Sequence, residues 1–313
     1  MQESIRRLFP EKIREVFDTC EMNEEFLEEI RIRIGQPIIF RYGKEELFLH
    51  SKEQRLTKEK EGAFVPSRED LEQMLLFLSR YSLYAFEEEI RQGYITLEGG
   101  HRVGLAGQVV MEDGKIKNMQ YINFMNIRVA REKKGCAKKM IPYLLHESSI
   151  FNTLIISPPG MGKTTYLRDA IRILSNGTAL MDGMRVCVID ERSEIAACHL
   201  GCPQNDVGIR TDVMDGCSKA QGMLMVLRSL SPQVIAVDEL GGKEDFDAVE
   251  KVVYCGSRIL GTVHATSMTE LEQKPYLNHW IREKIFERFV FLKRTEGGSR
   301  LFEVYDVEGK RLC

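Results

Sequence analysis

Apolar and polar positions along the first third of the chain alternate at spacings typical of helices and strands. Apolar residues between positions 5 and 17 recur three and four apart on either side of Pro10, which predicts two short helices. In the segment EEIRIRIGQPI, Ile30 and Ile32 alternate with charged residues. This two-residue period predicts a strand with one buried face.

The pattern then changes to helix and back to strand. Ser67 stands three residues before Asp70 and ahead of a helical apolar stripe, which predicts a helix that begins after Ser67. From position 93 to 131 the period returns to that of strands, and Asp113-Gly114 is a strong hairpin signal. We therefore expect an α+β domain over residues 1–135.

The remaining residues, 136–313, show a different alternation. Short apolar runs are separated by helical stretches, and these runs are TLIIS, RVCVID, VIAVDE and ILGTVHA. Such an order predicts a mostly parallel sheet covered by helices. The charge-rich segment EKKGCAKKM lies at the expected domain boundary.

Composition narrows the class of protein. The chain has 313 residues, enough for two domains, and its net charge of −3 argues against nucleic acid as the main partner. It contains no apolar run long enough for a secretory signal or a membrane span. We expect a cytoplasmic protein whose eight cysteines stay mostly reduced.

The loop after the run TLIIS resembles a phosphate-binding loop. It reads SPPGMGKTT and fits G-x-x-x-x-G-K-[ST] except that Ser157 replaces the first glycine. Ser157 precedes the N–H groups that would hold phosphate, so we expect the loop to work. Lys163, expected to be solvated without ligand, would contact the β- and γ-phosphates, and Thr164 would bind Mg²⁺. The expected ATP-binding residues are Pro159, Gly160, Met161, Gly162, Lys163, Thr164 and Thr165.

Acidic residues and a histidine follow the other apolar runs. Asp238 ends VIAVD and is expected to hold Mg²⁺ through water, while Glu239 would deprotonate the attacking water. His264 follows another run and could sense the γ-phosphate; the alternative is an ordinary hydrogen-bonded histidine. Because carboxyl ends of parallel strands face the ligand, these residues should meet. The expected fold of this part is a P-loop NTPase of the RecA-like class.

Motifs spread over nearly the whole chain resemble the stage III sporulation protein AA family of spore-forming Firmicutes. They include EIRIRIGQPI, TLEGGHRVGLAGQ, ISPPGMGKTTYLRD, VIDERSEIA and GTVHATS. That family is itself similar to motor ATPases of type II and type IV secretion and of pilus retraction. The resemblance implies a homo-hexameric ring on the mother-cell side of the forespore membranes. There it would associate peripherally with membrane proteins of the same sporulation complex and energise a channel.

The resemblance also implies roles for individual residues. VIDERSE matches the Asp box of secretion ATPases through Asp190, Glu191 and Glu194, and TVHAT matches the His box through His264. The Walker B segment departs from those motors, since LGG follows Glu239. Ring motors need an arginine from a neighbouring subunit. Our candidates, each with surface salt-bridge duty as the alternative, are Arg102, Arg128, Arg192, Arg210 and Arg228.

Three functions follow from these observations. The first is a Mg²⁺-dependent ATPase that drives a membrane-bound machine by domain motion. The second is a scaffold that assembles on binding ATP with negligible turnover, which would not need the base Glu239. The third is a nucleic-acid translocase, although the chain has no basic aromatic stripe of the kind that single-strand binders use.

Overall fold

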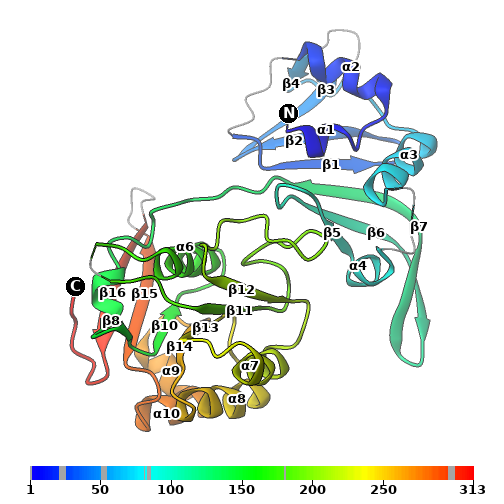
Figure 1. Ribbon diagram of the computed structural model, residues 1–313. Coiled ribbons are helices and arrows are strands. Elements are labelled where there is room, and N and C mark those ends of the chain that lie inside the picture. The colour runs from blue at the N-terminus through cyan, green and yellow to red at the C-terminus, as the bar shows by residue number, and fades with distance from the viewer. Residues whose placement is uncertain are drawn as a thin grey trace. The chain divides into compact units, whose positions relative to one another are not determined.

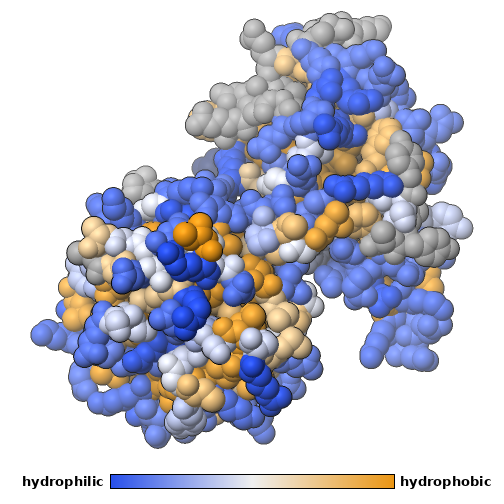
Figure 2. Space-filling model, viewed as in Figure 1, coloured by the Kyte–Doolittle hydropathy of each residue, from blue (hydrophilic) through white to orange (hydrophobic). Residues whose placement is uncertain are grey.

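The computed structural model describes residues 2–20, 26–50, 55–80, 82, 86–179, 181–294 and 300–313. The chain forms two compact units, residues 1–131 and 132–313, and each is described here by itself. Their dividing point lies close to residue 135, where the charge-rich segment places the predicted boundary. On the face that Figure 2 shows, hydrophilic residues cover most of each unit and hydrophobic residues reach the surface in small groups.

The first unit is an antiparallel sheet with helices packed against it (Figure 1). Its strands are hydrogen-bonded in the order β4-β3-β2-β1-β7-β6-β5. The helices are α1 (Glu3–Arg6), α2 (Glu11–Thr19), α3 (Arg68–Leu78) and α4 (Glu87–Gln92). The strands are β1 (Glu29–Arg33), β2 (Gln36–Tyr42), β3 (Glu45–His50), β4 (Arg55–Thr57), β5 (Tyr94–Thr96), β6 (Arg102–Glu112) and β7 (Lys115–Arg128).

Local sequence signals explain several of these elements. Ser67 caps α3 through its hydroxyl, which accepts from the backbone N–H of Asp70, while the Asp70 carboxylate accepts from that of Ser67. The β6–β7 hairpin turns at Asp113 and Gly114, both with positive φ. At Gly107 the register shifts, and a Cβ there would lie 2.6 Å from the carbonyl oxygen of Gln120. Glycine is therefore required at this bulge.

The second unit contains a seven-stranded sheet in the order β12-β11-β13-β14-β10-β15-β16. Neighbouring strands are parallel except for β15 and β16. The strands are β10 (Thr153–Ile156), β11 (Val186–Asp190), β12 (Thr211–Asp215), β13 (Val234–Val237), β14 (Arg258–Val263), β15 (Arg288–Arg294) and β16 (Arg300–Asp306). A small separate ladder joins β8 (Leu145–His146) and β9 (Ser149–Ile150).

Helices cover both faces of this sheet (Figure 1). They are α5 (Ile141–Leu144), α6 (Lys163–Asn176), α7 (Lys219–Ser229), α8 (Lys243–Tyr254), α9 (Met268–Gln273) and α10 (Pro275–Arg282). Successive residues of β10 point to opposite faces, so Ile155 belongs to the core under α6 and Ile156 to the core under α7, α8 and α10. Among the described residues no helix combines the length and apolarity that a membrane crossing needs.

Candidate nucleotide-binding site

The loop between β10 and α6 has an open cradle of backbone. Gly160 and Gly162 have φ of 75° and 90°, and Gly162 directly precedes α6. A Cβ built on Gly160 would meet no atom within 4 Å, so that side of the loop has room for a ligand. No side chain caps the N-terminus of α6, which leaves its first N–H groups available. Such a helix terminus attracts anions.

Ser157 fits the position where the loop motif has its first glycine. It is almost fully buried and does not have the positive φ that would require glycine. Its hydroxyl donates to the carbonyl of Pro158 at 3.0 Å. The departure from the motif therefore causes no backbone strain at this position.

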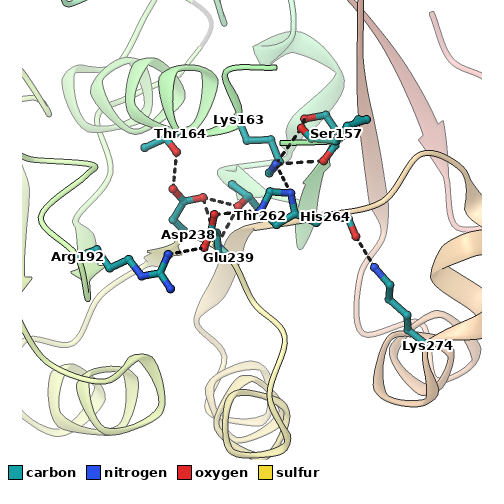
Figure 3. A network of polar contacts seen from close by, with 10 residues as sticks. Ser157, Lys163, Thr164, Arg192, Asp238, Glu239, Thr262, His264 and Lys274 are labelled. Carbon is teal, nitrogen blue, oxygen red and sulfur yellow. Dashed lines mark hydrogen bonds and ion pairs between the residues drawn. The ribbon is translucent and has the colours of Figure 1, made fainter. Parts of the chain in front are cut away.

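The expectation that Lys163 is solvated was wrong. Its side chain is only 6% exposed, and Nζ donates to the carbonyls of Ser157 at 3.1 Å and Pro158 at 3.3 Å. Nζ also lies 2.8 Å from Nδ1 of His264 (Figure 3). The loop folds back over its own lysine, and this burial lowers the pKa of Lys163 while the charges of Asp238 and Glu239 oppose that change.

His264 connects Lys163 to Glu239. Because an ammonium group only donates, Nδ1 of His264 must accept from Lys163, so Nε2 carries the ring proton. Nε2 lies 3.0 Å from Oε1 of Glu239 and donates to it. Lys274 of the segment before α10 donates to the backbone carbonyl of His264 (Figure 3).

Thr164 and Asp238 meet where the sequence predicts a Mg²⁺ site. The Thr164 hydroxyl donates to Oδ2 of Asp238 at 2.5 Å, and Thr262 donates to Oδ1. Among the described residues no group of three or more His, Cys, Asp or Glu side chains could hold a metal alone. Mg²⁺ in phosphate sites takes only one or two protein oxygens and completes its shell with phosphates and water. This donor pair fits that chemistry.

Glu239 has an unusual backbone conformation for a non-glycine residue. Its φ is 54°, and its N–H donates to the hydroxyl of Thr262 at 2.9 Å. The carboxylate contacts His264 and also Arg192, at 3.2 Å. The hydrogen bond from His264, helped by the charges of Arg192 and Lys163, holds the pKa of Glu239 below its usual value. Glu239 is therefore a carboxylate near neutral pH.

Asp190, which ends β11, and Glu191 and Glu194 after it lie beside Asp238 and Glu239. Together these residues line a small cavity of about 20 Å³. Asp190 is buried and accepts from the N–H groups of residues 194–196, so its carboxylate shapes the loop. Burial raises the pKa of Asp190 to about 6 despite those three hydrogen bonds. Glu191 pairs with Lys219 of α7.

The three candidate arginines of the second unit lie at different places and have different partners. Arg192 is exposed and pairs with Glu239 of its own chain. Arg210 donates to the carbonyl of Ser175, close to the end of α6. Arg228 lies in the last turn of α7, which leads to the start of β13. Arg210 and Arg228 thus precede the amino ends of strands, whereas the loop of their own chain follows the carboxyl end of β10.

The other two candidate arginines belong to the first unit. Arg102 begins β6 and stacks on the ring of Tyr94, with Cζ 3.4 Å from the ring centroid. Arg128 ends β7 opposite Arg102 in the β6–β7 ladder. A role for any of the five arginines across a subunit interface stays a prediction.

Two charged residues of α6 were not singled out from the sequence. Arg168 donates to the carbonyls of Glu194 and Ile195 and so joins α6 to the loop after β11. Asp169 is 3% exposed and accepts from the N–H groups of Gly135 and Ala137. Both lie in the stretch YLRD, directly after the loop motif. Charged residues in such a stretch are equally typical of a helix surface that faces solvent.

Comparison with known proteins decides the family. The family model described as sporulation stage III, protein AA matches residues 1–312. The chain is 40% identical over 289 residues to stage III sporulation protein AA of Bacillus subtilis (strain 168), across 91% of this chain and 89% of that protein. This chain belongs to the stage III sporulation protein AA family. The resemblance inferred from its motifs is confirmed.

The chain is similar to other proteins as well. It is 30% identical over 197 residues to the uncharacterized protein ycf45 of Cyanidium caldarium, across 61% of this chain and 52% of that protein. Among solved structures, the Legionella pneumophila ATPase DotB gives a TM-score of 0.59 at 16% identity, across 94% and 79% of the two chains. The pilus retraction motor PilT with bound ADP gives 0.60 at 16% identity, across 93% and 80%. The P-loop ATPase fold predicted from the sequence is confirmed.

Proposed function

We propose that this member of the stage III sporulation protein AA family is a Mg²⁺-dependent ATPase. The observation that carries the proposal is the convergence of three strand ends on one loop. Lys163 and Thr164 follow β10, Asp238 and Glu239 follow β13, and His264 follows β14. A lysine, a hydroxyl–carboxylate pair and a separate carboxylate base are the groups that phosphoryl transfer to water requires.

In this proposal the backbone N–H groups of the glycine loop and the ammonium group of Lys163 bind the triphosphate. The backbone N–H groups at the start of α6 bind phosphate oxygens without moving far, since the loop is already open at Gly160. Nζ of Lys163 exchanges its bonds to the carbonyls of Ser157 and Pro158 for phosphate oxygens. Thr164 and Asp238 would hold Mg²⁺, which would neutralise part of the phosphate charge.

Glu239 is positioned to accept a proton from water. Its depressed pKa keeps it ionised at neutral pH, and its φ of 54° directs the side chain to His264 and Arg192. His264 joins the base to the phosphate-binding lysine through its two ring nitrogens. Movement of Lys163 toward phosphate therefore removes a hydrogen-bond donor from His264 and alters the environment of the base.

The proposal is tested by steady-state phosphate release. Glu239→Gln keeps the size of the side chain but removes the base, and we expect turnover to fall by about 10²-fold or more. Fluorescent ATP should bind with similar affinity, because Glu239 is not among the proposed ATP-binding residues. Glu272→Gln, on the exposed side of α9, is the matched control and should hydrolyse ATP like the wild type. Equal turnover in the Glu239→Gln protein would refute the assignment of the base.

A second function, a nucleotide-dependent assembly scaffold, has one observation in its favour. The carboxylate of Glu239 is engaged by both Arg192 and His264, and Lys163 is engaged by loop carbonyls. If these contacts persist when nucleotide binds, hydrolysis is slow and binding alone drives assembly. The phosphate-release assay separates the two functions, because a scaffold forms its complex with turnover that the Glu239→Gln change does not alter.

The cellular role that we propose is to energise a membrane-embedded sporulation channel between mother cell and forespore. Membership of a sporulation stage III family and the fold shared with the pilus retraction motor PilT and the ATPase DotB support this role. In this proposal the protein is a homo-hexamer in the mother-cell cytoplasm. It contacts the membrane through membrane proteins of the same complex and drives them by domain motion.

A further inference from the structure

A cavity of about 470 Å³ lies next to Glu239 and His264, on the α10 side of the sheet. None of the phosphate-loop residues 157–165 lines it. Its walls come from the segment after β13, the end of β14 and the start of α10. They comprise Glu239, Leu240, Gly241, Gly242, Val263, His264, Lys274, Pro275, Tyr276, Leu277 and Trp280. The cavity therefore shares two residues with the nucleotide site and is otherwise separate from it.

Most of the cavity wall is apolar. Leu240, Val263, Leu277 and Trp280 are each less than 10% exposed, so they present fixed hydrophobic surface. Phe246 stacks on Trp280 with ring centroids 5.4 Å apart and planes at 10°, which holds the indole in place. A cavity of this size and lining suits a small organic molecule, whereas a polyphosphate would lose its hydration there without compensation.

The same cavity offers a donor to an anion, the ammonium group of Lys274. Lys274 precedes α10, whose N-terminus has no side-chain cap. Its ammonium group donates to the carbonyl of His264 and pairs with Glu270 at 3.3 Å. An ammonium has three donors, so the contacts described leave one for a ligand.

We propose that this cavity binds a small planar aromatic molecule that carries an anionic group. The aromatic body lies against the apolar wall beside Tyr276 and Leu277, and the anionic group accepts from Lys274. A bound molecule contacts Glu239 and His264 from the side away from Lys163. The cavity is thus a second ligand site. A molecule bound there would contact Glu239, the proposed base, without competing with nucleotide for the phosphate loop.

Trp280 is the single tryptophan of the chain and lines this cavity, so all tryptophan fluorescence comes from this position. The probe is 1-anilinonaphthalene-8-sulfonate, and N-phenyl-1-naphthylamine is its neutral counterpart without the sulfonate. We expect saturable quenching of Trp280 by the anionic probe, with affinity about tenfold higher than for the neutral one. Fluorescent ADP should neither displace the probe nor be displaced by it, because the loop residues are not shared.

Three variants locate the probe. Tyr276→Ala removes an exposed wall residue and should weaken both probes, while Tyr254→Ala, on the exposed face of α8, is the matched control and should bind like the wild type. Lys274→Gln should abolish the preference for the anion. Absent quenching, equal affinity for the two probes, or quenching unchanged in both Tyr276→Ala and Lys274→Gln would overturn the proposal. If a variant does not fold, the difference in affinity between the two probes on the wild-type protein still tests the proposal.

Discussion

His101 of the first unit is a residue whose charge is controlled by burial. It has no exposed surface, its Nδ1 accepts from the N–H of Ala130 at 3.0 Å, and its other nitrogen bonds Gln2. Burial lowers the pKa of His101 to about 4, whereas the unfolded chain has the ordinary value near 6.5. Below pH 6.5 the unfolded state therefore binds a proton that the folded state does not, and stability falls until pH 4.

The change His101→Gln tests this prediction. The wild-type first unit should lose about 2 kcal/mol of unfolding free energy between pH 7 and pH 5 through this residue. The variant should lack that part of the pH dependence, because an amide side chain does not titrate. Urea unfolding followed by far-UV circular dichroism measures it, with His279→Gln on α10 as the control. The same pH dependence in the His101→Gln protein would contradict the prediction.

At the scale of elements, α6 holds the segment that connects the two units. The Asp169 carboxylate accepts from the N–H groups of Gly135 at 2.9 Å and Ala137 at 2.8 Å, and also pairs with Arg172. The thiol of Cys136 lies 3.7 Å from the carbonyl of Thr165, in the first turn of α6. A displacement of α6 on nucleotide binding therefore acts directly on the connecting segment.

Asp169→Ala should release this segment while α6 stays helical. We expect the amides of residues 135–137 to lose hydrogen-exchange protection by about tenfold or more, since two buried N–H groups lose a charged acceptor. Hydrogen-exchange mass spectrometry of residues 132–140 measures the effect. Asp247→Ala, at an exposed position of α8, should leave their exchange unchanged. Retained protection in Asp169→Ala would show that other contacts hold the segment.

At the scale of the whole molecule, ligand binding and assembly should be linked. A ligand that binds the assembled form more tightly than the free subunit shifts the chain toward the assembly by mass action. We expect analytical ultracentrifugation to show a sixfold rise in mass when ATP and Mg²⁺ are added to Glu239→Gln, which binds but does not hydrolyse. Lys163→Ala should not assemble, because it lacks the phosphate-binding lysine. An unchanged mass in the Glu239→Gln protein would contradict the proposed ring.

Much of the fold could be predicted from the sequence because short-range patterns encode it. The two-residue period around Ile30, the cap at Ser67 and the Asp113-Gly114 turn each depend on neighbouring residues alone, and the structure contains all three elements. Strand β12 was not predicted. Its residues, TDVMD, lack an apolar run because an edge strand has one neighbour and stays partly exposed.

The sequence by itself determined the family, the order of most strands and helices, and the residues that end the strands at the phosphate loop. Motif spacing and hydrophobic period carry that information locally. Only the tertiary structure decided that Lys163 is buried and that His264 joins it to Glu239, since Lys163 and His264 are 101 positions apart. The aromatic cavity at Trp280 and the anchor at Asp169 likewise depend on packing between distant segments. Such contacts follow from how the sheet brings strand ends together, which no local pattern encodes.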